Sequence, residues 1–226
     1  MVRNNKRFAL AFRIGALTFA VAGVTAQIGV FKGAVSFGSF MYYTIQSNLL
    51  VVALFAMLVV RTAISLRDGD QGSSGWFPRF EMVCAADVLV TFIVFWALLA
   101  GGLEADYLLS FENLAVHTVT PLLCLADYLL FTKPRHMRYR DVYLTCIYPL
   151  FYAAFVTIAG FAGHVYYYTT ASAFSSRLIP VRFPYFFLDF DRIGNMVFAY
   201  IAGISVFVIL LGHGIYLLDA KVRKVK

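Results

Sequence analysis

The sequence predicts an all-α membrane protein in which six helices cross the bilayer and both termini face the cytoplasm. Hydrophobic residues make up 61% of the 226 residues, charged residues only 14%, and the mean hydropathy is +0.77. This composition is typical of polytopic membrane proteins and argues against a soluble domain. The apolar residues gather in six stretches, each long enough for the roughly 20 helical residues that a bilayer requires. Residues 1–226 are therefore expected to form a single six-helix transmembrane domain.

The six stretches lie near residues 8–30, 38–60, 80–102, 108–131, 141–165 and 193–218. Each is expected to be a helix, because lipid offers no hydrogen-bond partners to an open backbone and the alternating pattern of a β-barrel is absent. The first stretch is interpreted as a retained helix and not as a signal peptide, because its apolar run is long and contains Arg13. Arg13 lies near the cytoplasmic end, where its side chain is expected to extend to the lipid headgroups.

Basic residues determine the expected orientation. Most lysines and arginines precede the first span, lie in the second and fourth connections, or follow the last span, and this side is expected to be cytoplasmic. Because they lie in short runs between apolar spans, they indicate topology and not a nucleic-acid partner. The basic residues expected on the opposite side are Lys32, Arg177, Arg182 and Arg192.

The fifth connection is long, aromatic and rich in proline, and it lies on the expected outer side. Aromatic side chains favour the headgroup layer of a membrane. We therefore expect this loop to form a cap over the outer mouth of the helix bundle. Its candidate residues are Pro184, Phe187 and Asp189.

Two clusters of polar side chains interrupt the apolar spans. In the fourth span, Asn113, His117 and Pro121 recur every four residues and share one helix face. A histidine in hydrocarbon is costly and rarely lies there without a partner, and the missing amide hydrogen of Pro121 is expected to free the His117 carbonyl and bend the helix. In the second span, Thr44 and Asn48 share a face. The helical rise places Thr44 about 6 to 9 Å and His117 about 13 Å below the outer boundary, so the clusters are expected to meet.

These residue types together suggest a nucleophile and its base. A neutral His117 imidazole can take the proton of the Thr44 hydroxyl, which then attacks an acyl carbonyl and forms an ester intermediate. Asn48 is the candidate donor to the developing oxyanion. Asn113 is the candidate that holds the imidazole in its useful tautomer. The GxSxG, HExxH, Walker and GxGxxG motifs of other enzyme classes are absent.

The remaining intramembrane polar groups have weaker functional signals. Asp127 is expected to form an ion pair with Arg61 or with basic residues of the adjoining loop, whereas Asp87 has only apolar neighbours in the sequence. No cysteine has the spacing of a metal site, so all are expected to be small buried apolar side chains. We expect no metal, no cofactor and no obligate protein partner. The cysteines are Cys84, Cys124 and Cys146.

Three motifs carry a family resemblance: the Thr44 cluster, the sequence from Asn113 through His117 to Pro121, and the run FPYFFLD at residues 183–189. Through them the chain resembles the androgen-induced transmembrane protein family, whose members include hydrolases of fatty acid esters of hydroxy fatty acids, and a related prokaryotic group of six-helix membrane proteins. The resemblance implies a threonine nucleophile and a histidine partner, at Thr44 and His117. It also implies a lipid-ester substrate and, for this chain, a prokaryotic cytoplasmic membrane.

The favoured interpretation is thus an intramembrane hydrolase that cleaves ester bonds of long-chain lipids. A non-catalytic lipid-binding protein or a small transporter would use the same polar groups to hold a headgroup or relay a proton. A structural subunit would use them to join a partner helix. The requirement for the Thr44 hydroxyl separates the first interpretation from the others.

Overall fold

The computed structural model describes residues 5–70, 74–133, 137–170 and 178–219. Six helices in these ranges are long and apolar enough to cross a membrane, which confirms the predicted all-α polytopic fold. They run over Lys6–Gln27, Tyr43–Arg67, Pro78–Gly102, Phe111–Phe131, Tyr139–Phe161 and Met196–Leu217. The expected orientation remains a prediction, and several of its basic residues lie outside the described residues: Arg3, Arg135, Arg177, Lys221, Arg223, Lys224 and Lys226.

The spans are not all uninterrupted α-helices. The first two are α1 (Lys6–Gln27) and α2 (Tyr43–Arg67). The third joins α3 (Pro78–Val94) to a π turn, η4 (Phe95–Leu99), and a short 3-10 turn, η5 (Ala100–Gly102). The fourth joins α5 (Phe111–Leu114), a second π turn, η6 (Ala115–Val119), and α6 (Thr120–Phe131). The fifth begins as 3-10 turns, η7 (Tyr139–Cys146), and continues as α7 (Ile147–Phe161); the sixth is α9 (Met196–Leu217).

Short elements connect the spans. Val30–Lys32 (η2) and Phe37–Met41 (η3) are 3-10 turns between α1 and α2, and α4 (Ala105–Leu108) follows the third span. After α7 come a hairpin of β1 (Tyr167–Thr170) and β2 (Leu178–Val181), the turn η8 (Phe186–Leu188) and α8 (Phe190–Ile193). The strands are antiparallel, with Tyr167 opposite Val181 and Thr170 opposite Leu178.

The predicted start of the second span, near residue 38, was wrong. Residues 37–41 form η3, and Tyr42 then adopts an extended backbone before α2 begins at Tyr43. The helix also continues to Arg67, beyond the predicted end near residue 60. Hydropathy marks where a helix meets lipid, but backbone hydrogen bonds continue past that boundary. Because α2 begins at Tyr43, Thr44 lies in the first turn of this helix.

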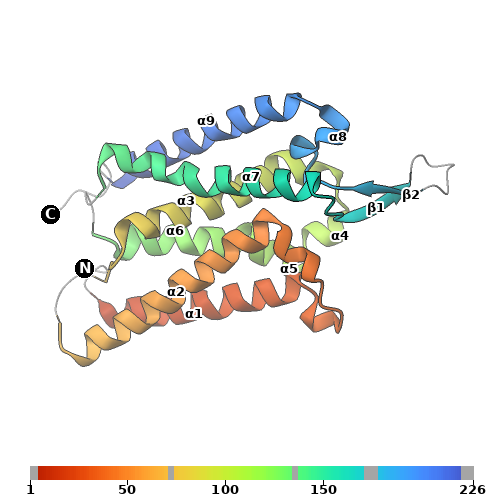
Figure 1. The fold of residues 1–226 in the computed structure, drawn as a ribbon. Helices are drawn as coiled ribbons and strands as arrows, with labels where there is room; N and C mark the ends of the chain where they lie inside the picture. Colours follow the sequence, from red (N-terminus) through yellow and green to blue (C-terminus); the bar gives the residue numbers. More distant parts are fainter. Residues whose placement is uncertain (1–4, 71–73, 134–136, 171–177, 220–226) are drawn as a thin grey trace. The chain divides into compact units, whose positions relative to one another are not determined.

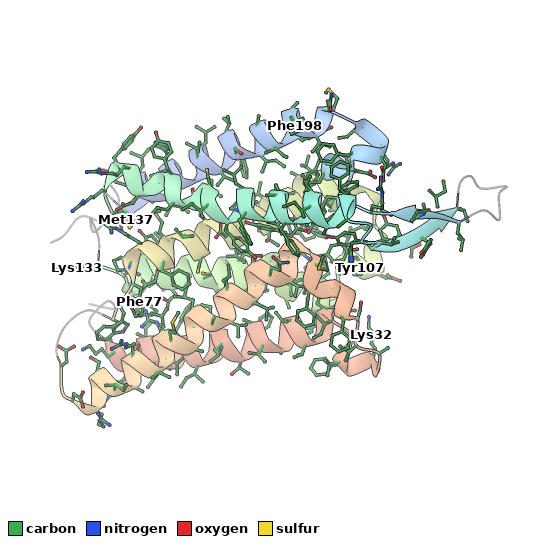
Figure 2. All side chains as sticks on the ribbon, in the orientation of Figure 1. Lys32, Phe77, Tyr107, Lys133, Met137 and Phe198 are labelled. Carbon is green, nitrogen blue, oxygen red and sulfur yellow. The ribbon has the colours of Figure 1, made fainter. Side chains whose placement is uncertain are left out.

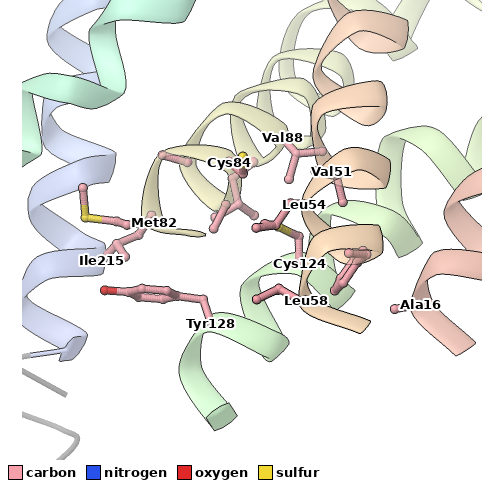
Figure 3. Close-up of a cluster of buried hydrophobic side chains, with 14 of the residues drawn as sticks. Ala16, Val51, Leu54, Leu58, Met82, Cys84, Val88, Cys124, Tyr128 and Ile215 are labelled. Carbon is pink, nitrogen blue, oxygen red and sulfur yellow. The ribbon is translucent and has the colours of Figure 1, made fainter. Parts of the chain in front are cut away.

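The described chain divides into two compact units. The first holds the residues up to Thr145 and those from Leu211 onward, and the second holds Cys146–Leu210. In the first unit α1 packs along α2, and α3 packs against α2 and α6 (Figure 1). One apolar core joins these helices, as Figure 3 shows for Val51 and Leu54 of α2, Val88 of α3 and Cys124 of α6. All three cysteines are buried, as predicted.

An ion pair of Lys32 lies at one of the two ends of the first unit. Lys32 and Tyr107 lie at one end, whereas Phe77 and Lys133 lie at the other (Figure 2). At the first of these ends Lys32 forms an ion pair with Glu112, Nζ to Oε1 at 2.7 Å. The hydrogen bond with this carboxylate raises the pKa of Lys32. The pair ties the connection between α1 and α2 to the start of the fourth span.

Arg13 does not extend to the headgroups, contrary to the prediction. Its side chain is fully buried and forms a two-pronged ion pair with Asp127, Nε to Oδ1 at 2.7 Å and Nη2 to Oδ2 at 3.0 Å. Its Nη1 donates to Thr62 Oγ1 at 2.7 Å and to the Ser74 carbonyl at 2.8 Å. The predicted ion pair of Asp127 therefore exists, but Arg13 and not Arg61 is its partner. The planar guanidinium suits this role because it has five donors to share among several acceptors.

The second unit contains α7, the hairpin and the aromatic loop. Gly160 of α7 allows this loop to pack closely, since a Cβ there would lie 2.4 Å from a ring carbon of Phe183. Tyr185 stacks on Phe187 with ring centroids 5.1 Å apart. Asp189 caps α8 by accepting from the amides of Asp191 and Arg192, and burial raises its pKa.

Candidate functional site

The structure brings Thr44 and His117 into contact within the first unit. The Thr44 Oγ1 lies 3.3 Å from His117 Nε2, although the two residues are 73 positions apart in the chain. Thr44 belongs to the first turn of α2 and is partly buried, whereas His117 belongs to η6 and is 5% exposed. The prediction that the second and fourth spans are neighbours is therefore confirmed.

The imidazole of His117 is held on two sides. Its Nδ1 lies 3.1 Å from the carbonyl oxygen of Asn113. A carbonyl accepts hydrogen bonds and never donates them, so in neutral His117 the ring proton is on Nδ1 and the lone pair is on Nε2. Phe95 stacks on the other side, with ring centroids 3.8 Å apart and planes 22° apart. The imidazole thus directs its acceptor nitrogen at the Thr44 hydroxyl.

Asn113 orients His117, but not in the predicted way. The expectation was that its side chain would hold the ring, and the structure instead uses its backbone carbonyl. The Asn113 carboxamide is turned back and donates from Nδ2 to the Leu108 carbonyl at 2.9 Å. Its amide donates to Ser110 Oγ at 3.3 Å, which caps the start of α5. These bonds hold the first turn of the fourth span, and with it the carbonyl that the histidine needs.

Asn48 is not free to act as the predicted oxyanion donor. Its Nδ2 donates to the Thr44 carbonyl at 2.8 Å and to the Val116 carbonyl at 3.0 Å. A carboxamide nitrogen has two hydrogens, and these two bonds use both. The residue is fully buried and connects α2 to η6, the two elements of the site.

Both spans that hold the His117 ring widen into π turns there. His117 is the central residue of η6, and Phe95 is the first residue of η4. Single π turns inside α-helices occur frequently at functional sites. In η6 the turn lies just before Pro121, which has no amide hydrogen to donate to the carbonyls behind it. The sequence predicted a bend and a free carbonyl at His117; the structure has a π turn there, and the bend remains a prediction.

A second cross-link lies beside the Phe95–His117 stack. Trp96 Nε1 donates to Thr118 Oγ1 at 3.0 Å, so successive residues of η4 contact successive residues of η6. Neither Phe95 nor Trp96 was a sequence candidate. An aromatic residue in an apolar span carries no signal of its own, and only its contact with a polar group reveals a role.

The start of α2 adds backbone donors to the site. Among the described residues no side chain caps this helix, and the amide of Gln46 donates back to the Tyr42 carbonyl at 3.1 Å. The amides of the first turn have no acceptor within their own helix. They also lie at the positive end of the helix dipole. The hydroxyl of Thr44 therefore lies beside backbone N–H groups suited to bind a negative oxygen.

The other sequence candidates lie elsewhere. The three cap residues, Pro184, Phe187 and Asp189, belong to the second unit, and the cap over the site remains a prediction. Asp87 is buried in α3, one turn before Thr91, and the Tyr43 hydroxyl donates to its backbone carbonyl at 3.4 Å. No group of three or more His, Cys, Asp and Glu within the described ranges is placed to hold a metal.

Comparisons with protein-family models, with curated proteins and with solved structures find no match to this chain. The functional argument therefore depends on the geometry of the site. What the contacts establish is a multi-pass membrane protein in which a threonine hydroxyl, a histidine with a defined acceptor nitrogen and the amino end of a helix lie together.

Proposed function

We propose that the protein is an intramembrane ester hydrolase, with Thr44 as nucleophile and His117 as general base. The observation that carries the proposal is the direction of the imidazole. Nδ1 donates to a fixed carbonyl, so the Nε2 lone pair is available to the hydroxyl 3.3 Å away. Such contacts are often long without substrate and shorten in the reacting complex.

The reaction follows from this geometry. His117 Nε2 takes the hydroxyl proton as Thr44 Oγ1 forms a bond to the carbonyl carbon of the ester. The same proton passes to the departing alcohol as the carbon–oxygen bond breaks, which leaves an acyl-threonine. Water then gives a proton to Nε2 and attacks the acyl carbon. The carboxylic acid leaves, and Thr44 recovers its proton.

Backbone amides replace Asn48 as the proposed oxyanion donors. The N–H groups of Thr44 and Ile45 belong to the uncapped first turn of α2. A nucleophile's own amide can serve this purpose, as it does in serine proteases. Removal of one oxyanion donor typically raises the barrier by about 2.7 to 4 kcal/mol, so these amides are proposed to supply a substantial part of the catalysis.

The proposed substrate is an ester of long-chain lipids, such as a fatty acid ester of a hydroxy fatty acid. Two arguments support it. The site belongs to spans that lie in lipid, so a substrate can enter laterally while its chains remain in hydrocarbon, and the motifs resemble those of the androgen-induced transmembrane hydrolases. By the same resemblance, we propose a prokaryotic cytoplasmic membrane as the location.

The test is covalent labelling of the detergent-purified protein by a fluorophosphonate, with the adduct located by mass spectrometry. We expect an adduct on Thr44 of the wild type, none with Thr44→Ala or His117→Ala, and retained labelling with Thr44→Ser. The matched control is Thr25→Ala, because Thr25 is a membrane threonine whose hydroxyl donates to the carbonyls of Val21 and Ala22 in its own helix. Labelling that persists in His117→Ala would exclude His117 as the base.

The alternative function is lipid binding or transport without catalysis. The observation that favours it is Asp87, a carboxylate buried in a membrane span, because intramembrane carboxylates often mark ion or proton paths. Folded wild-type protein that gives no adduct, but carries co-purified lipid, would support this alternative over the hydrolase.

A further inference from the structure

The carbonyl of Val116 loses its helical partners in η6. In an α-helix it would accept the amide hydrogen of residue 120, and in a π turn that of residue 121. The amide of Thr120 donates to Ala115 instead, and Pro121 has no amide hydrogen. A buried carbonyl without a donor is costly, so such groups are nearly always satisfied by some other group.

The Asn48 side chain supplies that donor from a different helix. Its Nδ2 lies 3.0 Å from the Val116 oxygen and 2.8 Å from the Thr44 oxygen. Only the nitrogen side of the carboxamide suits this position, because the two oxygens that face it belong to carbonyls, which can only accept. The Thr44 carbonyl also accepts from Ser47 Oγ at 3.1 Å, whereas the Val116 carbonyl has lost its helical donor. The Oδ1 atom has no hydrogen-bond partner among the described residues, so donation is what this side chain contributes.

We propose that Asn48 is a positioning residue that substitutes for the amide hydrogen missing at Pro121 and thereby holds Thr44 within reach of His117. One of its hydrogen bonds ends on the backbone of the nucleophile, and the other ends on the residue that precedes the base. Loss of the carboxamide separates α2 from η6 at the place where the hydroxyl and the imidazole meet. The catalytic part of this inference depends on the proposed hydrolase function.

This role of Asn48 can be tested by restoring the missing amide hydrogen at position 121. Asn48→Leu keeps the volume of the side chain and removes both donors. Pro121→Ala returns an amide hydrogen to the position that faces the Val116 carbonyl in the π turn. The double variant should therefore recover what Asn48→Leu loses. Pro121→Ala alone should change the rate by no more than about twofold, because a carbonyl oxygen accepts two hydrogen bonds.

The first measurement is the rate of fluorophosphonate labelling at Thr44, well below the melting temperature of every variant. We expect Asn48→Leu to lower it about tenfold to a hundredfold, since small displacements of a reacting group have effects of this size, and the double variant to regain most of the loss. Gln46→Leu is the matched control, because Gln46 is a carboxamide of α2 whose Nε2 donates to the Phe40 carbonyl, outside η6. An Asn48→Leu rate equal to wild type, or a loss that Pro121→Ala does not restore, would overturn the proposal.

The second measurement does not require catalysis. Diethyl pyrocarbonate modifies neutral, accessible imidazole nitrogens, and Nε2 of His117 is covered by its contact with Thr44. Asn48→Leu should raise the rate of modification at His117, and the double variant should return it toward wild type. If the wild type takes no fluorophosphonate, the hydrolase proposal fails and this measurement alone decides the positioning role. If Asn48→Leu gives no folded protein, folded double variant supports the role and its absence refutes it.

Discussion

The buried pair of Arg13 and Asp127 allows a sharp test of how the first unit is stabilised. The side chains are 0% and 3% exposed, and the guanidinium makes four hydrogen bonds of 2.7 to 3.0 Å. Arg13→Leu removes all four and leaves a carboxylate without its cation inside the helix bundle. Removal of one partner of a buried ion pair typically costs about 3 to 5 kcal/mol, mostly because the other charge is left uncompensated.

The double variant separates this cost from ordinary packing. Asp127→Leu combined with Arg13→Leu removes both charges, and such replacements are often neutral or stabilising. The Ser74 carbonyl and Thr62 still lose a donor, and each loss is worth about 1 kcal/mol. Because the Thr62 hydroxyl also donates to the Leu58 carbonyl, that residue retains one bond. We therefore expect the double variant to recover at least about half of what Arg13→Leu loses.

The assay is reversible unfolding in mixed micelles, with the free energy of unfolding compared at a single detergent composition. Arg67→Leu is the control, because its pair with Asp68 joins side chains that are 77% and 53% exposed, and exposed pairs contribute little. The reasoning is refuted if Arg13→Leu lowers the free energy of unfolding by less than about 1 kcal/mol, or if the double variant is less stable than the single one.

Three further predictions concern single sites. Gly23→Ala should lower both the melting temperature and Thr44 labelling, because the new Cβ would lie 2.7 Å from the Cβ of Ala115 in η6. Gly15→Ala is the control: its Cβ would have nothing within 4 Å, so it should stabilise α1 by up to about 1 kcal/mol. Equal melting temperatures of the two variants would contradict this prediction. Asp87→Asn should raise the melting temperature in detergent, because it removes an ionisable group buried in a membrane span, and a fall would show that the carboxyl makes a stabilising contact. Asp189→Ala should remove the cap of α8 and cost about 1 kcal/mol locally, measured as faster hydrogen exchange at the two capped amides, and unchanged exchange would disprove the capping role.

Hydropathy alone predicted the six spans, because the need to bury apolar length in lipid is a property of consecutive residues. Simple helical rise also placed Thr44 and His117 at similar depth, and the structure joins them at 3.3 Å. The predicted depth of Thr44 depended little on the wrong helix boundary, because Thr44 lies near the start of α2 whether the helix begins at residue 38 or 43. Pro121 was a further sound signal, because the missing hydrogen of proline disturbs a helix wherever it occurs.

The partners of the polar groups required the tertiary structure. Arg13 looked like a headgroup anchor because its position near a span end is all that the sequence shows, and its bond to Asp127 crosses 114 residues. Asn48 looked like an oxyanion donor because its carboxamide can donate, and only the nearby carbonyls of Thr44 and Val116 show that both hydrogens are already used. Periodicity defines which residues share a helix face, but a hydrogen bond depends on the atom that another helix places within about 3 Å. For this reason the sequence was sufficient to identify the nucleophile and base candidates, and only the packed helices could show how the imidazole is oriented and what connects it to α2.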